Sequence, residues 1–316
     1  MQNLSPQHLL IPFAFCNSAG CRQALTTLKL PHLEKLLPRL TPEATDTGDA
    51  ASLSPPHERA LARALHLPVE DGLIPWAAWQ AHEADGAWAF ITPCHWQTSS
   101  RQVAMSAAEL PDFTAQESQT LLAAMQPYFA EDAIELRYDQ ANRWLACGDL
   151  FRDLATASLD RVAGCSVAGW LPSASRAIAL QRLQGEMQML LYNHPVNDAR
   201  EARGLATVNS FWISGTGPHP CPLPAGEGAK TPTVVATLRA AALAQDWSAW
   251  ASAWQVIDAT VCKALLSAQA NAEPVQLTLC GERNAQTFVA KPQSIRHRVI
   301  NFFGNQQAAC AVLERL

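Results

Sequence analysis

Residues 193–217 form a stretch, NHPVNDAREARGLATVNSFWISGTG, whose pattern permits few kinds of local structure. Pro195 suits the first turn of a helix, where a missing N–H costs nothing, and Asn193 is placed to act as the N-cap. Gly204 can end this helix in the left-handed conformation. Residues 208–213 are then typical of a largely buried strand. The stretch therefore predicts a helix that leads directly into a strand, which is a unit of α/β proteins.

The rest of the chain repeats this alternation of short apolar runs with segments of helical spacing. The predicted strands are 8–15, 88–96, the hairpin 134–147, 275–280 and 298–303. The predicted helices are 30–40, 57–67, one that starts at Thr114 with a Glu117 capping box, 173–192, a Trp-rich core helix over 247–265, and 305–316. Interleaved strands and helices predict an α/β fold with a mostly parallel central sheet flanked by helices.

The order of these elements predicts two domains. The N-terminal run, the 208–214 strand and residues 274–303 are expected to share one sheet, in a core domain of residues 1–60 and 205–316. The 134–147 hairpin fits better in an inserted, smaller α+β lobe of residues 61–204. Two segments rich in Pro, Thr, Asp, Ala or Gly, 41–56 and 216–233, are predicted to be loops.

Composition excludes several classes of protein. The chain has 316 residues, of which 48% are hydrophobic, so it can bury a large core. Its net charge of −5 and the lack of a Lys/Arg run argue against a nucleic-acid partner. No run approaches the ~18–20 apolar residues of a membrane span, and the N-terminus has no secretory pattern, so we expect a cytoplasmic protein without a membrane partner. The nine scattered cysteines contain no Cys-x-x-Cys pair, and we expect no metal site.

Five polar residues of the 193–217 stretch are candidates for ligand binding. They are His194, Asn197, Arg200, Arg203 and Asn209. They lie near helix and strand ends, where α/β proteins usually hold ligands, and a guanidinium with neighbouring amides suits a phosphate or carboxylate group. The alternative is a purely structural role, in which the Asn side chains cap backbone groups and Arg200 pairs with Glu201 or Asp198. Both interpretations remain open, and no catalytic residue is assigned.

The same stretch resembles a known family. His194–Asn197, Arg200, Gly204, Val208–Asn209, Trp212 and Gly215–Gly217 resemble the HPxN…R…G…AN…W…G-x-G block of archaeal-type cofactor-independent phosphoglycerate mutases, which belong to the alkaline-phosphatase superfamily. The runs WAFITPCHW, LQGEMQMLLYNHPVN and VNSFW are similar to bacterial proteins labelled putative phosphoglycerate mutase or RpfE-type regulatory protein. The resemblance implies an alkaline-phosphatase-like core with the smaller lobe inserted in it.

The chain departs from this family where the family does its chemistry. The mutases use two metal ions to activate a serine, with Asp and His as most of the ligands. Their Asp-Gly after the first strand is Phe13–Ala14 here, and their Ser-Asp pair falls opposite Pro56–His57, with Ser54 only nearby. Their late Asp-His is replaced by Cys280–Glu282, and no Asp in this chain has a His four residues later. Side chains of Phe, Ala and Pro cannot coordinate a metal.

These departures predict a catalytically inactive, mutase-like protein that acts in the cytoplasm through binding. Its partner would be a small phosphate- or carboxylate-bearing ligand or another protein, and no cofactor is expected. Two alternatives remain open: an active metal-dependent phosphotransferase with a rebuilt site, and a structural partner subunit.

Overall fold

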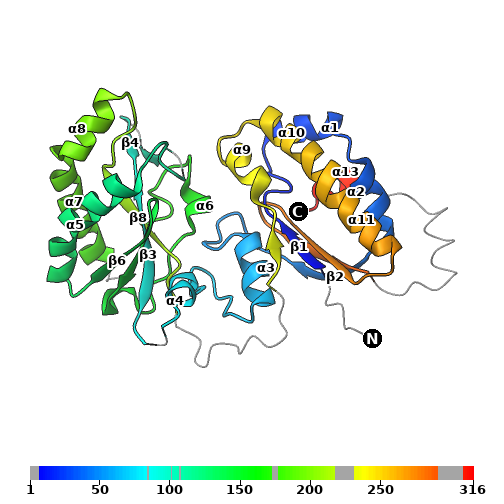
Figure 1. The fold of residues 1–316 in the computed structure, drawn as a ribbon, viewed down its shortest axis with the longest axis horizontal. Coiled ribbons are helices and arrows are strands. Elements are labelled where there is room, and N and C mark those ends of the chain that lie inside the picture. Colours follow the sequence, from blue (N-terminus) through cyan, green and yellow to red (C-terminus); the bar gives the residue numbers. More distant parts are fainter. Residues whose placement is uncertain are drawn as a thin grey trace. The chain divides into compact units, whose positions relative to one another are not determined.

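The computed structural model describes residues 7–83, 85–100, 102–106, 108–172, 177–217, 231–290 and 309–316. The chain divides into two compact units (Figure 1). The first unit contains Met1–Ala51, Pro55–Leu65 and Gly226–Leu316, and the second contains Ser52–Ser54 and His66–Ala225. The α/β class is as predicted, whereas the domain limits 1–60, 61–204 and 205–316 remain a prediction.

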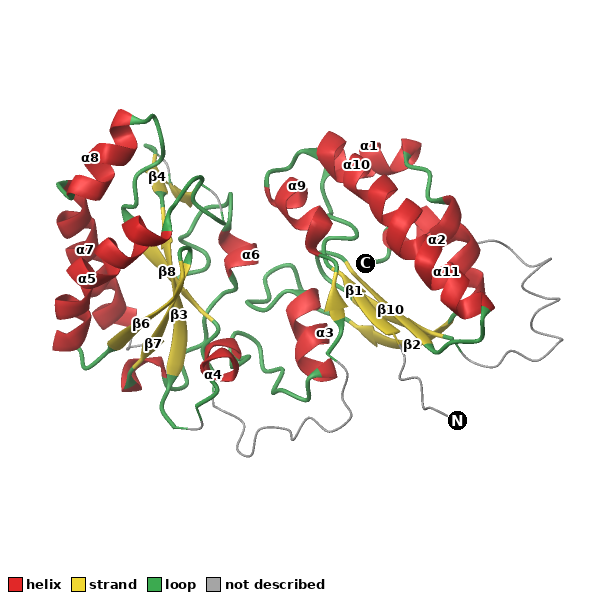
Figure 2. Cartoon of the chain, in the orientation of Figure 1, coloured by secondary structure: helices red, strands yellow, loops and turns green. Residues whose placement is uncertain are grey.

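The first unit is built on a five-stranded sheet in the order β2-β11-β10-β1-β9. Figure 2 labels its strands β1, β10 and β2. These strands are β1 (Gln7–Ile11), β2 (Thr41–Asp46), β9 (Thr233–Val234), β10 (Val275–Cys280) and β11 (Ala285–Val289). β1 pairs in parallel with β10 and β9, but β11 runs antiparallel to both β10 and β2. The sheet is therefore mixed, and the prediction of a mostly parallel sheet is wrong. Only residues 281–284 connect β10 to β11, and so short a connection allows antiparallel pairing alone.

Helices cover both faces of this sheet. They are α1 (Ala19–Thr27), α2 (Pro31–Leu36), α3 (Pro56–Ala64), α9 (Arg239–Leu243), α10 (Trp247–Ile257), α11 (Lys263–Ala270) and α13 (Ala309–Leu313), with short 3₁₀ turns at Leu37–Arg39 and Ala236–Leu238 and a π-helical segment, Asp258–Cys262, between α10 and α11. Leu9 and Ile11 of β1 belong to the core that contains Trp250 and Trp254, whereas Leu10 lies with Cys280 beside α3. This alternation places β1 inside the unit, with side chains buried on both faces.

The predicted loop over 41–56 contains a strand. β2 occupies Thr41–Asp46 at the edge of the sheet, and most of its residues are exposed. Because an edge strand needs no apolar face and tolerates a proline such as Pro42, its sequence lacks the alternation that marks a half-buried strand. The predicted 298–303 strand lies outside the described residues, and only α13 of the predicted 305–316 helix is described.

The second unit has an antiparallel sheet in the order β6-β7-β3-β8. Its elements are α4 (Trp76–Ala81), β3 (Trp88–Cys94), β4 (Trp96–Thr98), β5 (Val103–Met105), α5 (Ala115–Glu131), β6 (Glu135–Gln140), β7 (Arg143–Cys147), a 3₁₀ turn at Asp149–Phe151, α6 (Leu159–Val162), α7 (Ala177–Tyr192), α8 (Pro195–Ala202) and β8 (Ser210–Ser214). β6 and β7 form the predicted hairpin, and Thr114 and Glu117 form the predicted capping box of α5. Residues of α5, α7 and the sheet share one apolar core.

The strand predicted over 208–214 exists but lies in a different sheet from the one expected. β8 pairs antiparallel with β3, from Ser214 beside Phe90 to Ser210 beside Cys94. The prediction that this strand joins the N-terminal run in one sheet is wrong, because a buried apolar strand carries no mark of its partner. None of the described helices is long and apolar enough to span a membrane.

Candidate functional site

The candidate site begins at α8, whose ends follow the sequence pattern with one correction. The N-cap is His194 rather than Asn193, because His194 Nδ1 accepts the Val196 N–H at 3.2 Å. Burial lowers the pKa of His194 below its usual value of 6.5, against the opposing effect of Asp198. A neutral imidazole keeps the lone pair that this cap requires. Gly204 follows the helix in the left-handed conformation at φ +70°, as predicted.

Asn197 is almost completely buried, and its carboxamide binds backbone on both sides of α8. Its Nδ2 donates to the carbonyls of Leu191 at 2.8 Å and Val208 at 2.7 Å. Its Oδ1 accepts the Val208 N–H at 2.8 Å. One side chain thus joins the end of α7 to the segment that precedes β8, and all three hydrogen-bonding partners are main-chain groups.

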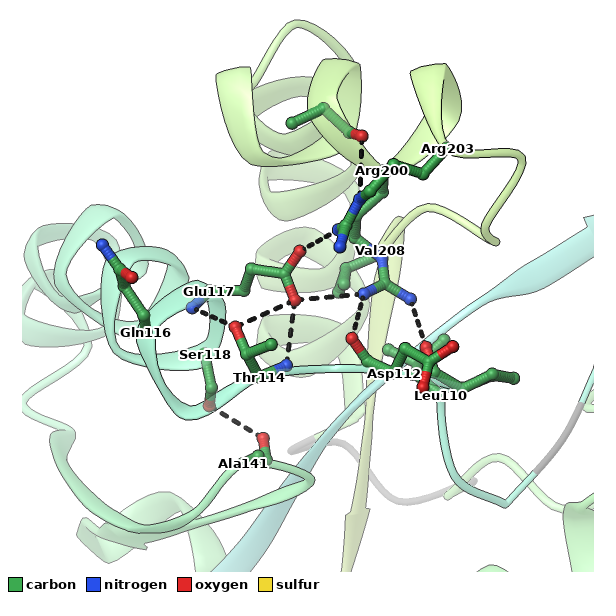
Figure 3. Close-up of polar contacts among 12 residues, drawn as sticks. Leu110, Asp112, Thr114, Gln116, Glu117, Ser118, Ala141, Arg200, Arg203 and Val208 are labelled. Atoms are coloured by element: carbon green, nitrogen blue, oxygen red, sulfur yellow. Dashed lines mark hydrogen bonds and ion pairs between the residues drawn. The ribbon is translucent and has the colours of Figure 1, made fainter.

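Arg200 is fully buried and donates to four oxygen atoms. Figure 3 shows its contacts with Asp112 and Glu117. Its Nε binds the Ala206 carbonyl at 2.8 Å and its Nη2 binds the Pro111 carbonyl at 2.9 Å. Its Nη1 contacts the Asp112 carbonyl at 3.4 Å and Glu117 Oε2 at 3.2 Å. The carboxylate partner is therefore Glu117 at the start of α5, and the predicted pairing with Glu201 or Asp198 is wrong.

Arg203 shares this carboxylate from a more exposed position. Its Nη2 pairs with Glu117 Oε1, its Nε donates to the Ala199 carbonyl at 3.2 Å, and its side chain is 47% exposed. Burial alone would raise the pKa of Glu117, but hydrogen bonds from Thr114 and Arg203 and the charge of Arg200 outweigh it and hold this pKa below 4.5. The capping box predicted a role for Glu117 in α5, but no local signal could reveal its two arginine partners.

Asn209 makes a third set of backbone contacts, with β4 of the two-stranded β4–β5 sheet. Its Oδ1 accepts the Trp96 N–H at 2.7 Å and its Nδ2 donates to the Trp96 carbonyl at 2.9 Å. The side-chain amide thus binds one edge of β4 in the way that a neighbouring strand would. Two residues earlier, the Thr207 carbonyl lies 2.7 Å from His95 Nδ1. The segment before β8 therefore fixes both His95 and Trp96.

The Gly-x-Gly that ends the stretch also has a packing role. A side chain at Gly217 would place its Cβ 2.1 Å from the Leu73 carbonyl oxygen, and Gly217 has φ +154°. Between the glycines, the hydroxyl of buried Thr216 lies 2.8 Å from that of Thr156. These contacts match the interpretation that the stretch has a structural role. The ligand-binding prediction for the five polar residues is not tested by them and remains a prediction.

A second candidate region lies at the carboxyl ends of β1 and β10. The Phe13 ring lies 5.2 Å from the His57 ring, between centroids. The Trp250 indole donates to the Phe13 carbonyl at 2.9 Å, and the Trp254 indole donates to the Ala14 carbonyl at 3.2 Å. This loop is therefore held by aromatic side chains of α10 through its backbone.

The residues around this loop do not fit the two metal ions that the family resemblance implies. Cys280 is fully buried, and burial raises the pKa of its thiol, which keeps the sulfur protonated. Glu282 Oε2 accepts the Asn17 N–H at 2.7 Å. Ser54 belongs to the second unit, where its hydroxyl accepts the Gly72 N–H at 2.9 Å. Across the described part of the chain, no group of three or more His, Cys, Asp or Glu side chains is placed to hold a metal ion.

Comparison with known proteins adds two distant structural likenesses. No family model and no curated protein matches the chain. The chain is similar to the PH0037 protein from Pyrococcus horikoshii at 13% identity and a TM-score of 0.42, over 91% of this chain and 88% of that one. It is also similar to a cofactor-independent phosphoglycerate mutase from Thermoplasma acidophilum at 13% identity and a TM-score of 0.36, over 96% and 94%. At this level of overlap, function has to be argued from the chain's own residues.

Proposed function

We propose that the chain is a catalytically inactive relative of the cofactor-independent phosphoglycerate mutases that acts in the cytoplasm through binding. The relation is supported by the residues of the 194–217 block. The observation that carries the loss of activity is the end of β1, where the Phe13 ring contacts the His57 ring and both carbonyls of the Phe13–Ala14 pair accept indole N–H groups.

Phosphoryl transfer through two metal ions requires hard oxygen or imidazole donors that converge on both ions. In the resembling family this place supplies Asp. Here the Phe13 and Ala14 side chains are hydrocarbon, and the two backbone oxygens already accept hydrogen bonds. Cys280 presents a buried, protonated thiol. A single substitution could not restore such a site, because several ligands would have to be added together.

A direct assay tests this proposal. Purified protein, with Mn²⁺, Mg²⁺ or Zn²⁺ added, is expected not to interconvert 2- and 3-phosphoglycerate or to hydrolyse p-nitrophenyl phosphate above a blank without enzyme. An active cofactor-independent mutase under the same conditions serves as the positive control. Protein purified without chelator is expected to carry far less than one metal ion per chain by elemental analysis.

The rebuilt-enzyme alternative makes the opposite forecast. It requires a clear rate together with about two bound metal ions per chain, as in two-metal phosphoryl-transfer sites. It also requires that Ser54→Ala or Glu282→Gln abolish the rate while the protein keeps its melting temperature. That combination would overturn the proposal. A rate that survives both substitutions would be assigned to a contaminating phosphatase.

A further inference from the structure

Two cysteines lie together in the first unit, in the segment that joins β1 to α1. Cys16 follows the Phe13–Ala14 pair at the end of β1, and Cys21 lies in the first turn of α1. The backbone N–H of Cys16 donates to Cys21 Sγ at 3.4 Å. The two thiols are also hydrogen-bonded to each other. This segment therefore holds a pair of sulfur atoms in contact.

The local backbone brings the two sulfurs together. Ser18 is the N-cap of α1, and its hydroxyl accepts the Cys21 N–H at 3.1 Å. The Ser18 N–H donates to the Cys16 carbonyl at 2.8 Å, so the chain turns tightly just before the helix. Cys21 is the third residue of α1, and its Cβ points back toward the N-terminus of the helix, where this turn lies. A cap and a turn thus place two side chains in contact that are five positions apart.

The surroundings of Cys21 favour its thiolate. The hydrogen bond from the Cys16 thiol has the largest effect and lowers the pKa of Cys21. The Cys16 N–H lowers this pKa further, whereas burial and the charge of Glu282 oppose it. The first turn of a helix also stabilises a thiolate, because its N–H groups carry partial positive charge. The thiolate is the form of cysteine that attacks a disulfide.

The two sulfurs differ in their access to solvent. Cys21 is fully buried, whereas Cys16 is only half-buried. A small molecule can therefore reach Cys16, and Cys21 is the second thiol in contact with it. An accessible cysteine next to a second thiol that can displace a bound group is the usual arrangement of a redox-sensitive pair.

We propose that Cys16 and Cys21 are a modification site, at which a small-molecule disulfide such as oxidised glutathione converts the pair into a reversible disulfide. The Cys16 thiolate attacks one sulfur of the small disulfide and expels the other half as a thiolate, which takes the remaining proton of the pair. Cys21 Sγ then attacks Cys16 Sγ and expels the second half. Two protein thiols and one small disulfide thus become one protein disulfide and two small thiols.

Peptide mapping of the full-length protein tests this proposal, because trypsin releases residues 1–22 as one peptide whose only cysteines are these two. The protein is incubated with millimolar oxidised glutathione, denatured, alkylated with iodoacetamide and digested. The peptide is expected to be lighter by two hydrogen atoms and to carry no alkyl group. Dithiothreitol added before alkylation should restore two alkylated cysteines.

Three variants identify the role of each sulfur. Cys21→Ser should leave glutathione attached to Cys16, because no second thiol can expel it. Cys16→Ser should leave Cys21 reduced, because that sulfur is fully buried. Cys165→Ser, which changes an exposed cysteine of the second unit, should leave the disulfide unchanged. Circular dichroism before oxidation checks that each variant is folded.

Three outcomes would overturn the proposal. The wild-type peptide could keep two alkylated cysteines after oxidation, it could carry a glutathione on each cysteine, or Cys16→Ser could take up glutathione at Cys21 as readily as Cys21→Ser does at Cys16. The wild-type result decides the first two even if a variant does not fold. None of these measurements involves metal ions, phosphoglycerate or a bound ligand, so this proposal and the proposed function fail separately.

Discussion

The end of β1 in the first unit and the 194–209 segment of the second unit differ in how their polar groups are bound. At the end of β1, the side chains of Phe13 and Ala14 are hydrocarbon, and their backbone carbonyls are bound by Trp250 and Trp254. In the 194–209 segment, buried polar side chains bind the backbone of loops, as Asn197 and Arg200 do. The first place is held through its backbone by side chains of α10, whereas the second supplies the polar side chains that bind the backbone around it.

This difference shows that a polar motif can stabilise the fold without taking part in catalysis. Asn197, Arg200 and Asn209 bind backbone groups of the segments around α8, β8 and β4. Buried carbonyl and N–H groups without partners are costly, so such side chains can be required by the fold alone. A motif of Asn and Arg at strand ends therefore predicts a buried polar position more securely than it predicts a ligand.

Arg200→Ala is the change that would most sharply break this comparison. It would leave the Ala206, Pro111 and Asp112 carbonyls without this donor and remove one partner of Glu117. We expect the free energy of unfolding of the second unit to fall by about 3–4 kcal/mol, because each buried carbonyl that loses its donor costs about 1–3 kcal/mol. Urea denaturation followed by circular dichroism measures this loss.

Arg203→Ala is the matched control, because Arg203 binds the same carboxylate from a half-exposed position. Its loss should cost about 1 kcal/mol or less. Equal effects of the two substitutions would contradict the structural role of Arg200. So would an Arg200→Ala protein of unchanged stability that has lost a stabilising response to phosphate, because that response belongs to a ligand site.

Asn197→Ala should have the second-largest effect. It removes three backbone hydrogen bonds and leaves the Val208 N–H and two carbonyls buried without this partner. We expect a loss of about 2–3 kcal/mol by the same measurement. Asn193→Ala changes an exposed asparagine close by in sequence and should alter stability by less than about 0.5 kcal/mol. A small effect of Asn197→Ala would show that the backbone contacts are weak or replaced by water.

Local patterns in the sequence predicted local structure well. The Thr114–Glu117 spacing predicted the capping box, alternation around Asp139 predicted the β6–β7 hairpin, and the glycine at 204 predicted the end of α8. Each of these features is decided by residues a few positions apart, through caps, turns and strand alternation. The fold class followed from their order along the chain.

Long-range pairing could not be predicted in the same way. Arg200 meets Glu117 across 83 positions, and β8 pairs with β3 rather than with strands of the first unit. Nothing in either segment specifies such a partner, since an apolar strand suits many sheets and an arginine suits many carboxylates. The site residues were recognised as polar groups at element ends, but whether they contact backbone or face a ligand depends on segments distant in sequence.

Trp250→Phe tests the other half of the comparison, at the end of β1. The substitution keeps an aromatic ring in the core but removes the indole N–H that binds the Phe13 carbonyl at 2.9 Å. We expect a loss of about 1–2 kcal/mol from the first unit, from one hydrogen bond and a small cavity. Trp247→Phe, at a partly buried position of the same helix, should cost less. If the two variants are equally stable, the hydrogen bond does not hold this loop.

The smallest expected effect is a dependence on pH that belongs to Glu117 alone. Its pKa in the folded protein lies below the usual 4.5 because hydrogen bonds and arginine charges outweigh burial. A carboxyl group with a lowered folded pKa stabilises the protein fully above its unfolded pKa, and this contribution is lost as the pH falls through the folded pKa.

The difference in stability between wild type and Glu117→Gln should therefore be constant from pH 7 to about 5. This gap should narrow below pH 4.5, where the protonated acid becomes similar to the amide. Urea midpoints of the two proteins at pH 7, 5, 4 and 3 measure this gap. A Glu117 gap that stays constant down to pH 3 would mean that the two arginines do not favour the charged carboxylate, and the ionic part of this cluster would then be absent.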